Sequence, residues 1–284
     1  MATTSPPPHK APPPPPARGN RTPPSNTATV PSKNFAIQRG KTLAFHKTVI
    51  YGPGGVGKSE LCSLLAKVGV RPLMLDLDME TEHLDVARVQ IGPFEELRSA
   101  VQDTKFLDPF DAVVVDSLTK AEEMAVSWTL ANVKHEKGHY VDSIEGYGFG
   151  KGFTHVYETF LKLLCDLDAI VRAGKHVVCT AHDCTTTVPN PMGEDWIRWE
   201  PRLQHPSSGK SSIRLRVKEW ATHLLYIGYD QNVDENGKAE GSGTRTIYPR
   251  ELPSHLAKSR TLSEPIPYKK DDPELWKQLF SKEN

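Results

Sequence analysis

Residues 52–59 read GPGGVGKS and match the pattern GxxxxGK[ST]. Glycines suit such a loop because successive backbone N–H groups must turn inward around a phosphate. The lysine can reach the outer phosphates of a nucleotide, and the hydroxyl can ligate Mg²⁺. The alternative is a structural glycine turn. The spacing predicts a phosphate-binding loop of Gly52, Pro53, Gly54, Gly55, Val56, Gly57, Lys58, Ser59 and Glu60, followed by a helix.

A second ligand for the metal is expected at the end of Ala112-Val113-Val114-Val115-Asp116. Four small apolar residues predict a buried strand, and its last residue then emerges at the same sheet edge as the glycine loop. Asp116 is placed there to hold Mg²⁺ through water. In the alternative interpretation Asp116 caps the following helix.

Carboxylates also follow a third apolar run, in the segment from Asp76 to Glu82. A general base at this place would polarise the water that attacks the outer phosphate. Asp78 and Glu80 are the candidates, with Glu82 weaker. Acidic residues are also common after strands and at the starts of helices, so the alternative is that they have no catalytic role.

The run from Lys175 to Ala181 delivers His182 to the same edge, where a polar side chain can sense the outer phosphate or order the attacking water. A zinc site of His182, Asp183 and Cys184 is the competing interpretation. It is disfavoured because adjacent residues cannot all face one ion.

The elements that must position these residues alternate between apolar runs and amphipathic stretches, which predicts an α/β fold with a mostly parallel sheet. Asn236-Gly237 predicts a hairpin turn. Strands are expected at 47–51, 72–76, 112–116, 176–181, 223–229 and 244–248, and helices at 58–68, 93–103, 119–133 and 156–173.

Composition divides the chain into three parts. Residues 1–34 hold eleven of the 24 prolines and no acidic residue, which predicts a disordered, basic tail. Residues 35–264 are expected to form the globular domain. Residues 265–284 are expected to form a C-terminal tail with a short helix that starts near Pro273.

The formal net charge is zero, so the field of the whole chain does not favour nucleic acid. No apolar run is long enough to cross a bilayer, and we expect a cytoplasmic protein without a membrane partner, in a bacterial or phage-infected cell. The four cysteines lack the spacing of a disulfide scaffold and are expected to be reduced thiols.

Taken together, these segments resemble the RecA-like P-loop ATPases, and within them the phage-type ATPases of single-strand annealing and recombination, related to RadA and KaiC. The resemblance covers about residues 36–263. It is carried by YGPGGVGKSEL, LDLDMETEHLDV, VVVDSLT, YGFGKGF, HVVCTAHD and AKSR.

This resemblance implies ATP and Mg²⁺ as cofactors. It also implies a sheet in which the 176–181 strand lies between the 47–51 strand, which precedes the glycine loop, and the strand that ends at Asp116. Asp78 falls where RecA relatives carry a catalytic glutamate, so hydrolysis is expected to be slow. His182 falls where RecA carries a phosphate-sensing glutamine. Lys258 and Arg260 resemble the pair that RadA-type and KaiC-type relatives insert into a neighbouring subunit, which implies a homo-oligomer with ATP at subunit interfaces.

The resemblance also implies single-stranded DNA as a partner, with a single-strand-binding protein as a further one. The two segments that would face DNA are expected to be loops, at residues 146–153 and at about 185–212. Aromatic and basic residues interleave in both, a pattern that suits base stacking with phosphate contact. In the alternative, these side chains pack down as a lid. The candidates are Phe149, Lys151, Phe153, Trp196, Arg198, Trp199 and Arg202.

The sequence therefore predicts an ATPase that acts on single-stranded DNA in recombination, repair or annealing. One alternative is a nucleotide-dependent adaptor that neither binds DNA nor hydrolyses ATP significantly, which the shorter Asp78 keeps open. Another is a small-molecule P-loop kinase, although the segment 184–212 has only Arg198 and Arg202 for a lid.

Overall fold

The computed structural model describes residues 45–233 and 239–280, all within the compact unit Leu43–Asn284. The proline-rich tail predicted at 1–34 and the turn predicted at Asn236-Gly237 lie outside the described residues. Among the described helices, none combines the length and apolar character needed to span a membrane. All four cysteines are free, and two of them, Cys62 and Cys179, are buried.

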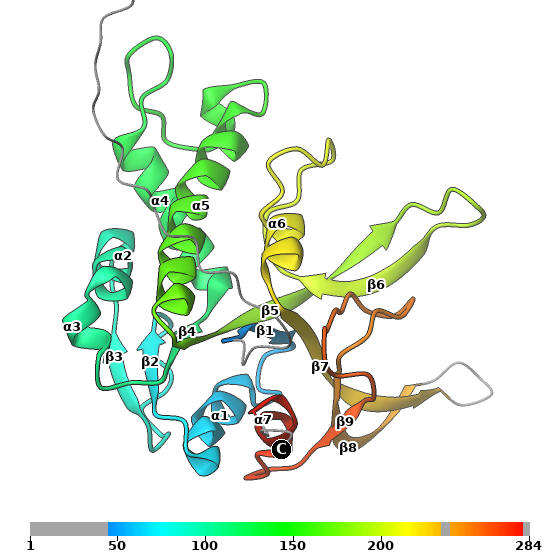
Figure 1. The fold of residues 1–284 in the computed structure, drawn as a ribbon. Coiled ribbons are helices and arrows are strands. Elements are labelled where there is room, and N and C mark those ends of the chain that lie inside the picture. The colour runs from blue at the N-terminus through cyan, green and yellow to red at the C-terminus, as the bar shows by residue number, and fades with distance from the viewer. Residues whose placement is uncertain (1–44, 234–238, 281–284) are drawn as a thin grey trace, which may run out of the picture. The chain divides into compact units, whose positions relative to one another are not determined.

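A mostly parallel sheet of nine strands runs through the described residues (Figure 1). Its order is β3-β2-β4-β5-β1-β7-β8-β9, and β6 pairs with β5 outside this path. The six strands from β3 to β7 in this order pair with one another in parallel, which confirms the predicted fold and the place of β5 between β1 and β4. The bounds are β1 Lys47–Gly52, β2 Pro72–Asp76, β3 Ala87–Gln90, β4 Ala112–Asp116, β5 His176–Val188, β6 Trp196–Pro201, β7 His223–Val233, β8 Ala239–Tyr248 and β9 Ile266–Tyr268.

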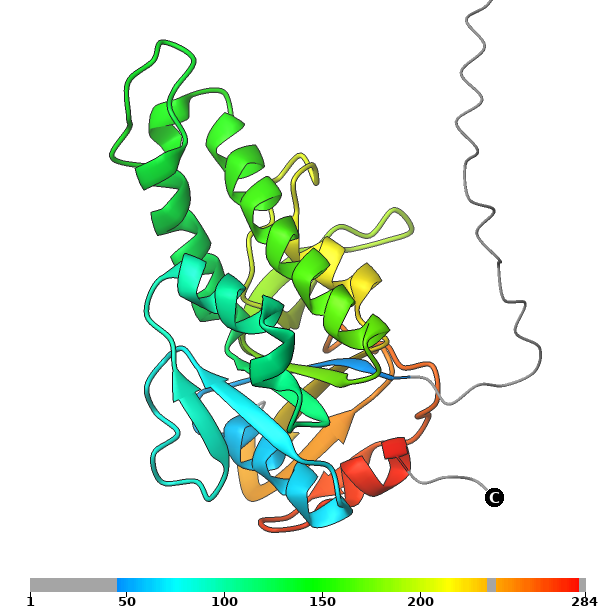
Figure 2. The ribbon, with the colours of Figure 1, turned by 60° about the vertical axis from the view of Figure 1, so that its left-hand side comes forward.

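Helices cover both faces of the sheet, and each face has its own apolar core (Figure 2). On one face, α2, α4, α5 and α6 pack against alternate residues of the strands, and on the other face α1, η1 and α7 do so. Two buried faces explain why the central strands read as continuous apolar runs. The bounds are α1 Lys58–Ser63, η1 Leu64–Val68, α2 Phe94–Gln102, α3 Thr104–Leu107, α4 Leu118–Asn132, η2 Glu145–Tyr147, α5 Lys151–Arg172, α6 Ile213–Trp220 and α7 Glu274–Phe280.

Helix α5 shows how the apolar spacing determines an element. Val156, Phe160, Leu163 and Leu167 recur at helical spacing and are all buried, and Gly174 ends the segment with a φ of 82°. The helix begins at Lys151, five residues before its predicted start. The first turn carries too few apolar residues for periodicity alone to place it.

The segment from about Thr185 to Ser212, expected as a loop, is instead partly a β-hairpin. Strand β5 continues past Ala181 to Val188 and pairs antiparallel with β6. Three consecutive threonines, 185–187, lie in this extension, and their branched side chains favour strand geometry. Helix α6 then returns the chain to the sheet.

The C-terminal residues to Phe280 pack on the same unit as the sheet. Strand β9 pairs with β8, and Trp276 on α7 is fully buried. The Trp276 indole N–H donates a 2.6 Å hydrogen bond to the Leu61 carbonyl on α1. Helix α7 therefore supports the helix that follows the glycine loop.

Candidate functional site

Strands β1, β2 and β4 end at one edge of the sheet, where the parallel pairing of β5 also ends. Gly52 on β1 lies beside His182 on β5, and Asp76 on β2 lies beside Asp116 on β4. Because β5 lies between β1 and β4, the glycine loop, the two aspartates and the histidine share this edge. Ligands of open α/β sheets bind at this edge, outside the carboxyl ends of the strands.

The glycine loop has the backbone that its sequence predicts. A Cβ on Gly52 would lie 2.1 Å from the Ile227 carbonyl oxygen, and Gly57 has a φ of 97°. Neither position accepts another residue without strain. A Cβ on Gly54 or Gly55 would meet nothing within 4 Å, so no other residue packs against the tip of the loop on that side.

Two side chains from the β7–β8 pair hold this loop from outside. The Arg245 guanidinium donates to the Val56 carbonyl at 2.9 Å, and the Tyr229 hydroxyl donates to the Gly55 carbonyl at 3.3 Å. Both bonds use carbonyls and leave the loop N–H groups to other acceptors. The Val56 N–H donates to the Pro53 carbonyl at 3.4 Å. Glu60 is half-buried and accepts a hydrogen bond from the Tyr268 hydroxyl at 3.3 Å.

Lys58 opens α1 and is buried against the loop. Its ammonium donates to the Gly52 and Pro53 carbonyls at 2.8 and 2.9 Å. Burial lowers the pKa of Lys58, while the nearby carboxylates of Asp116 and Asp183 raise it. The cation is thus held beside the loop with acidic groups close by.

Asp116 is only 7% exposed, and its carboxylate accepts a hydrogen bond from the Thr180 hydroxyl on β5. That bond orients the carboxylate at the end of β4. Ser59, at the second position of α1, adds a hydroxyl on the loop side. Carboxylate and hydroxyl oxygens are hard donors, so this pair fits Mg²⁺.

The turn after β2 separates the candidate bases. Asp76 is buried and accepts hydrogen bonds from the Glu80 N–H and from the Thr81 N–H and hydroxyl, which shape the turn. Asp78 accepts a 3.0 Å hydrogen bond from the Ser117 hydroxyl at the start of α4. Asp78 and Glu80 are both exposed, so the bond to Ser117 rather than burial distinguishes Asp78.

Partial burial raises the pKa of Asp78, and the hydrogen bond from Ser117 opposes this rise. Asp116 raises the pKa further and His182 lowers it, so these three groups are electrostatic neighbours. The structure therefore brings Asp78 to the edge that carries Asp116 and His182.

His182 is fixed through its backbone. Its N–H donates to the Thr119 hydroxyl at 3.0 Å, and its carbonyl accepts the Arg202 N–H at 2.8 Å. Burial lowers the pKa of the imidazole, and the charges of Lys58 and Arg202 lower it further. The ring is therefore neutral at neutral pH and can donate one hydrogen bond and accept another.

Lys258 and Arg260 lie away from the glycine loop of their own chain. Lys258 pairs with Leu224, which lies beside Val49, three residues before Gly52 on β1 and so about 10 Å from it along the strand. The Lys258 ammonium caps the end of α6 by donating to three carbonyls, those of residues 218, 219 and 221. Arg260 is exposed, near His223.

The first group of nucleic-acid candidates spans a turn and a helix start. Phe149 is fully exposed, with a φ of 49°. Lys151 begins α5 and forms an ion pair with Glu136, and Phe153, in the same helical turn, is half-buried. The structure therefore leaves Phe149 as the exposed aromatic of this group.

The second group belongs to β6 and its end. Arg198 is ion-paired with Glu200 and Glu251, and its side chain is 13% exposed. The Trp199 ring stacks on Tyr226 with centroids 5.6 Å apart, and the Trp196 side chain is half-buried with its indole N–H turned inward. Arg202, which follows β6, lies instead at the edge that carries His182.

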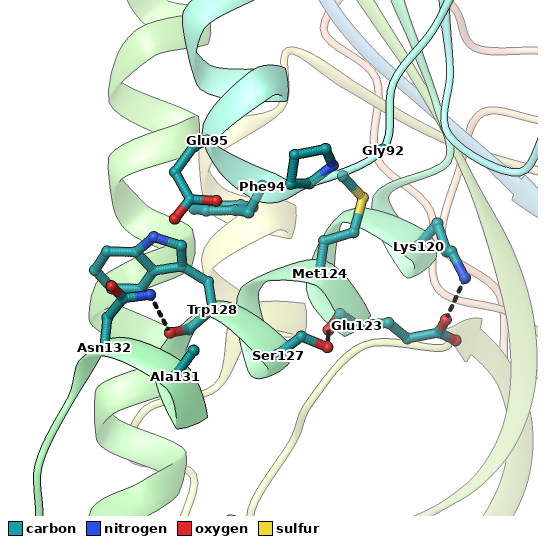
Figure 3. Close-up of a pocket in the computed structure, with 11 residues that line it drawn as sticks. Gly92, Phe94, Glu95, Lys120, Glu123, Met124, Ser127, Trp128, Ala131 and Asn132 are labelled. Carbon is teal, nitrogen blue, oxygen red and sulfur yellow. Dashed lines mark hydrogen bonds and ion pairs between the residues drawn. The ribbon is translucent and has the colours of Figure 1, made fainter. Parts of the chain in front are cut away.

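A surface cavity of about 480 Å³ lies between the start of α2 and α4 (Figure 3). Phe94, Met124 and Trp128 line it together with polar groups that pair with one another, such as Lys120 with Glu123 at 3.2 Å. Its lining includes no residue of the glycine loop. The cavity is therefore not part of the site at the strand ends.

Several contributors to the site were not predicted from the sequence. Thr180 and Ser117 orient the two aspartates, and Thr119 fixes His182. Glu122 on α4 accepts the Gln204 N–H with both carboxylate oxygens, at 2.8 and 3.1 Å. Of these residues, only Thr180 could have been noticed in the sequence, because it is the one polar residue among the buried positions of β5.

Comparison with known proteins gives a family. No curated protein matches the chain. Among solved structures, the flagellar accessory protein FlaH from Methanocaldococcus jannaschii is similar with a TM-score of 0.36 and 13% identity, over 72% of this chain and 78% of FlaH. Residues 44–261 match the family described as an AAA domain. That match spans the glycine loop, β4 and β5, and the chain therefore belongs to the AAA domain family of P-loop ATPases.

Proposed function

We propose that the chain binds ATP with Mg²⁺ at the strand-end site and hydrolyses it to ADP and phosphate. The observation that carries this proposal is the arrangement of Lys58, Asp78, Asp116 and His182, which come from four separate segments to one sheet edge. A phosphate-binding loop without the other three groups would support binding alone.

Each group has a role that its surroundings support. Lys58 and the free N–H groups at the start of α1 bind the outer phosphates. Ser59 and Asp116 are the residues that would hold Mg²⁺, which neutralises charge on the phosphates. Asp78 accepts the proton of the attacking water, and neutral His182 orients that water or the phosphate. Because aspartate is one methylene shorter than glutamate, we expect slow turnover.

Phosphate release tests this proposal, with nucleotide affinity measured alongside. Lys58→Ala should lose both ATP binding and phosphate release, because the outer phosphates lose their cation. Lys67→Ala is the matched control, since Lys67 forms an exposed ion pair with Asp271. Asp78→Asn should keep ATP binding and lose turnover by about 100-fold, as expected for a general base. Equal phosphate release from wild type and Lys58→Ala would contradict hydrolysis at this site, and the adaptor alternative would then stand.

We further propose that hydrolysis serves a role on single-stranded DNA, in recombination, repair or annealing. The support is the exposed Phe149, which offers an aromatic face for base stacking worth about 1–3 kcal/mol per base. Single-stranded DNA should raise the phosphate release rate, and Phe149→Ala should reduce DNA affinity about 5- to 100-fold. Met192→Ala, which changes another fully exposed apolar side chain, is the control. Absence of DNA binding by a chain that binds ATP would exclude this role.

We also propose that the chain forms a homo-oligomer in which Arg260 reaches the ATP of a neighbouring subunit. Exposure of Arg260, and its distance from the loop of its own chain, support a role in trans. Mixing Lys58→Ala with Arg260→Ala should restore part of the activity that each lacks, because each supplies what the other has lost. No restoration in assembled mixtures would count against shared sites. A single-strand-binding protein is a further partner to test in the same assay.

A further inference from the structure

Arg202 follows β6 in sequence but lies at the sheet edge that carries the glycine loop and His182. Its N–H donates to the His182 carbonyl at 2.8 Å, and its own carbonyl accepts the Thr119 hydroxyl at 3.5 Å. His182 on β5 lies beside Gly52, the last residue of β1, and Thr119 lies in the first turn of α4. The backbone of Arg202 is therefore anchored between His182 on β5 and the helix that follows Asp116.

The segment that carries Arg202 is held on both sides. Before it, Pro201 is the last residue of β6 and pairs with Asp183. After it, the Gln204 N–H donates to the Glu122 carboxylate. The Gln204 side-chain amide donates to the carbonyls of Phe153 and Ser211 at 2.9 and 2.7 Å. The backbone that carries the Arg202 side chain is therefore positioned before a ligand arrives.

The guanidinium of Arg202 differs from those of two nearby arginines. Arg198 and Arg214 are both ion-paired with Glu200, at 2.6 Å each. Among the side chains that the structure describes, Arg202 has no ion-pair partner, and the residue is exposed. Arg202 can therefore bind a ligand without breaking an ion pair.

The groups that face Arg202 explain which ligand it would accept. Burial lowers the pKa of both Lys58 and His182, and the positive charge of Arg202 lowers each of them further. Arg202 also faces the Glu122 carboxyl, whose pKa it lowers. An anion bound between Lys58 and Arg202 would be attracted by both cations. A guanidinium matches phosphate oxygens with two parallel hydrogen bonds.

We infer that Arg202 contacts the terminal phosphate of ATP bound at the glycine loop of its own chain and stabilises the charge that develops there during hydrolysis. This inference rests on the proposed function. In that reaction the water oxygen forms a bond to the terminal phosphorus, and the bond from phosphorus to the bridging oxygen of ADP breaks. Arg202 neither gains nor loses a proton, because a guanidinium stays charged.

This role changes the interpretation of two predicted residues. Arg202 was a nucleic-acid candidate, and it becomes a nucleotide contact within the chain. Arg260 then adds to the rate in an assembly, but a single subunit keeps the activity that Arg202 supports. An arginine that contacts the transferred phosphoryl group in the same chain contributes in the way that a trans-acting finger does.

The test compares Arg202→Ala and Arg202→Lys with wild type in single-turnover hydrolysis and in equilibrium binding of ATP and ADP. Arg202→Ala should lower the single-turnover rate about 100-fold or more, and it should weaken ATP about 10-fold while ADP affinity changes less than about 2-fold. The rate and the ATP affinity of Arg202→Lys should lie between those of wild type and Arg202→Ala, because lysine keeps the charge but not the paired donors. Arg216→Ala is the control, since Arg216 is a surface residue of α6 near Glu219.

Three results would overturn the inference. An unchanged rate and an unchanged preference for ATP over ADP would show that Arg202 does not contact the terminal phosphate. Equal losses of ATP and ADP affinity, with a lower melting temperature, would show a structural role. Loss of single-stranded DNA binding with unchanged nucleotide binding would restore the nucleic-acid interpretation. If wild type binds ATP without turnover, hydrolysis fails as a proposal, and the ATP-to-ADP affinity ratio alone still decides the role of Arg202.

Discussion

Replacing Glu122 with glutamine should change how the stability of the protein depends on pH. Glu122 lies in the first half of α4 and accepts the Gln204 N–H with both oxygens. Burial raises the pKa of this carboxyl from 4.5 to about 7, against the opposing effects of the Gln204 hydrogen bond and the charge of Arg214. The protonated form is therefore the one that the fold favours.

The free energy of unfolding falls as pH rises, because the Glu122 carboxyl has a higher pKa in the folded chain than in the unfolded one. Below the unfolded pKa of 4.5 both states hold the proton, and the full stability is present. As pH rises through 4.5 and then 7, the unfolded chain releases the proton first, so folding loses free energy over this window. At about 1.4 kcal/mol per pKa unit, the loss reaches about 3 kcal/mol by pH 8. The melting temperature would fall by about 6–12 °C for a domain of this size.

Thermal melting of wild type and Glu122→Gln from pH 4.5 to pH 8 measures this loss. The amide keeps an acceptor for the Gln204 N–H, so the two proteins should be nearly equal at the acid end and diverge as pH rises, with the variant more stable. Glu123→Gln is the matched control, because Glu123 is exposed and should show no divergence. A constant difference across the range would refute the raised pKa. The histidines with lowered pKa values titrate in both proteins and cancel in the difference.

Two further perturbations test the supports of the site. Trp276→Ala should destabilise the protein by about 3–5 kcal/mol in chemical denaturation, since it removes a fully buried ring and the hydrogen bond to Leu61; a loss below about 1 kcal/mol would mean that α7 does not support α1. Thr180→Val should raise the Mg²⁺ concentration needed for half-maximal ATP binding about 10-fold, because Asp116 loses the hydroxyl that orients it; an unchanged requirement would remove Asp116 from the metal site.

The fold and the inner part of the site could be predicted because their signals are local. The run of valines that ends at Asp116 specifies a strand buried on both faces, and the structure has that strand with the predicted bounds. The glycine loop has a fixed spacing between strand and helix, and α1 begins at Lys58 as expected. Parallel strands then bring their carboxyl ends together without further information.

The outer part of the site depends on pairing between distant segments, which a single sequence does not display. Strand β6 has an exposed Ile197 and mixed polarity, so its pairing with β5 leaves little alternation to detect. Arg202 reaches His182 only because that hairpin folds back. Likewise, the spacing around Lys258 could not show that its ammonium caps α6.

The central claim is that the loop from Gly52 to Ser59 binds the phosphates of ATP, and a crystal structure with Mg²⁺ and a non-hydrolysable ATP analogue tests it most directly. The account predicts that the Lys58 ammonium leaves the Gly52 and Pro53 carbonyls and contacts the outer phosphates, with the metal near Ser59 and Asp116. Nucleotide bound elsewhere, for example in the cavity between α2 and α4, with the Lys58 contacts unchanged, would contradict it.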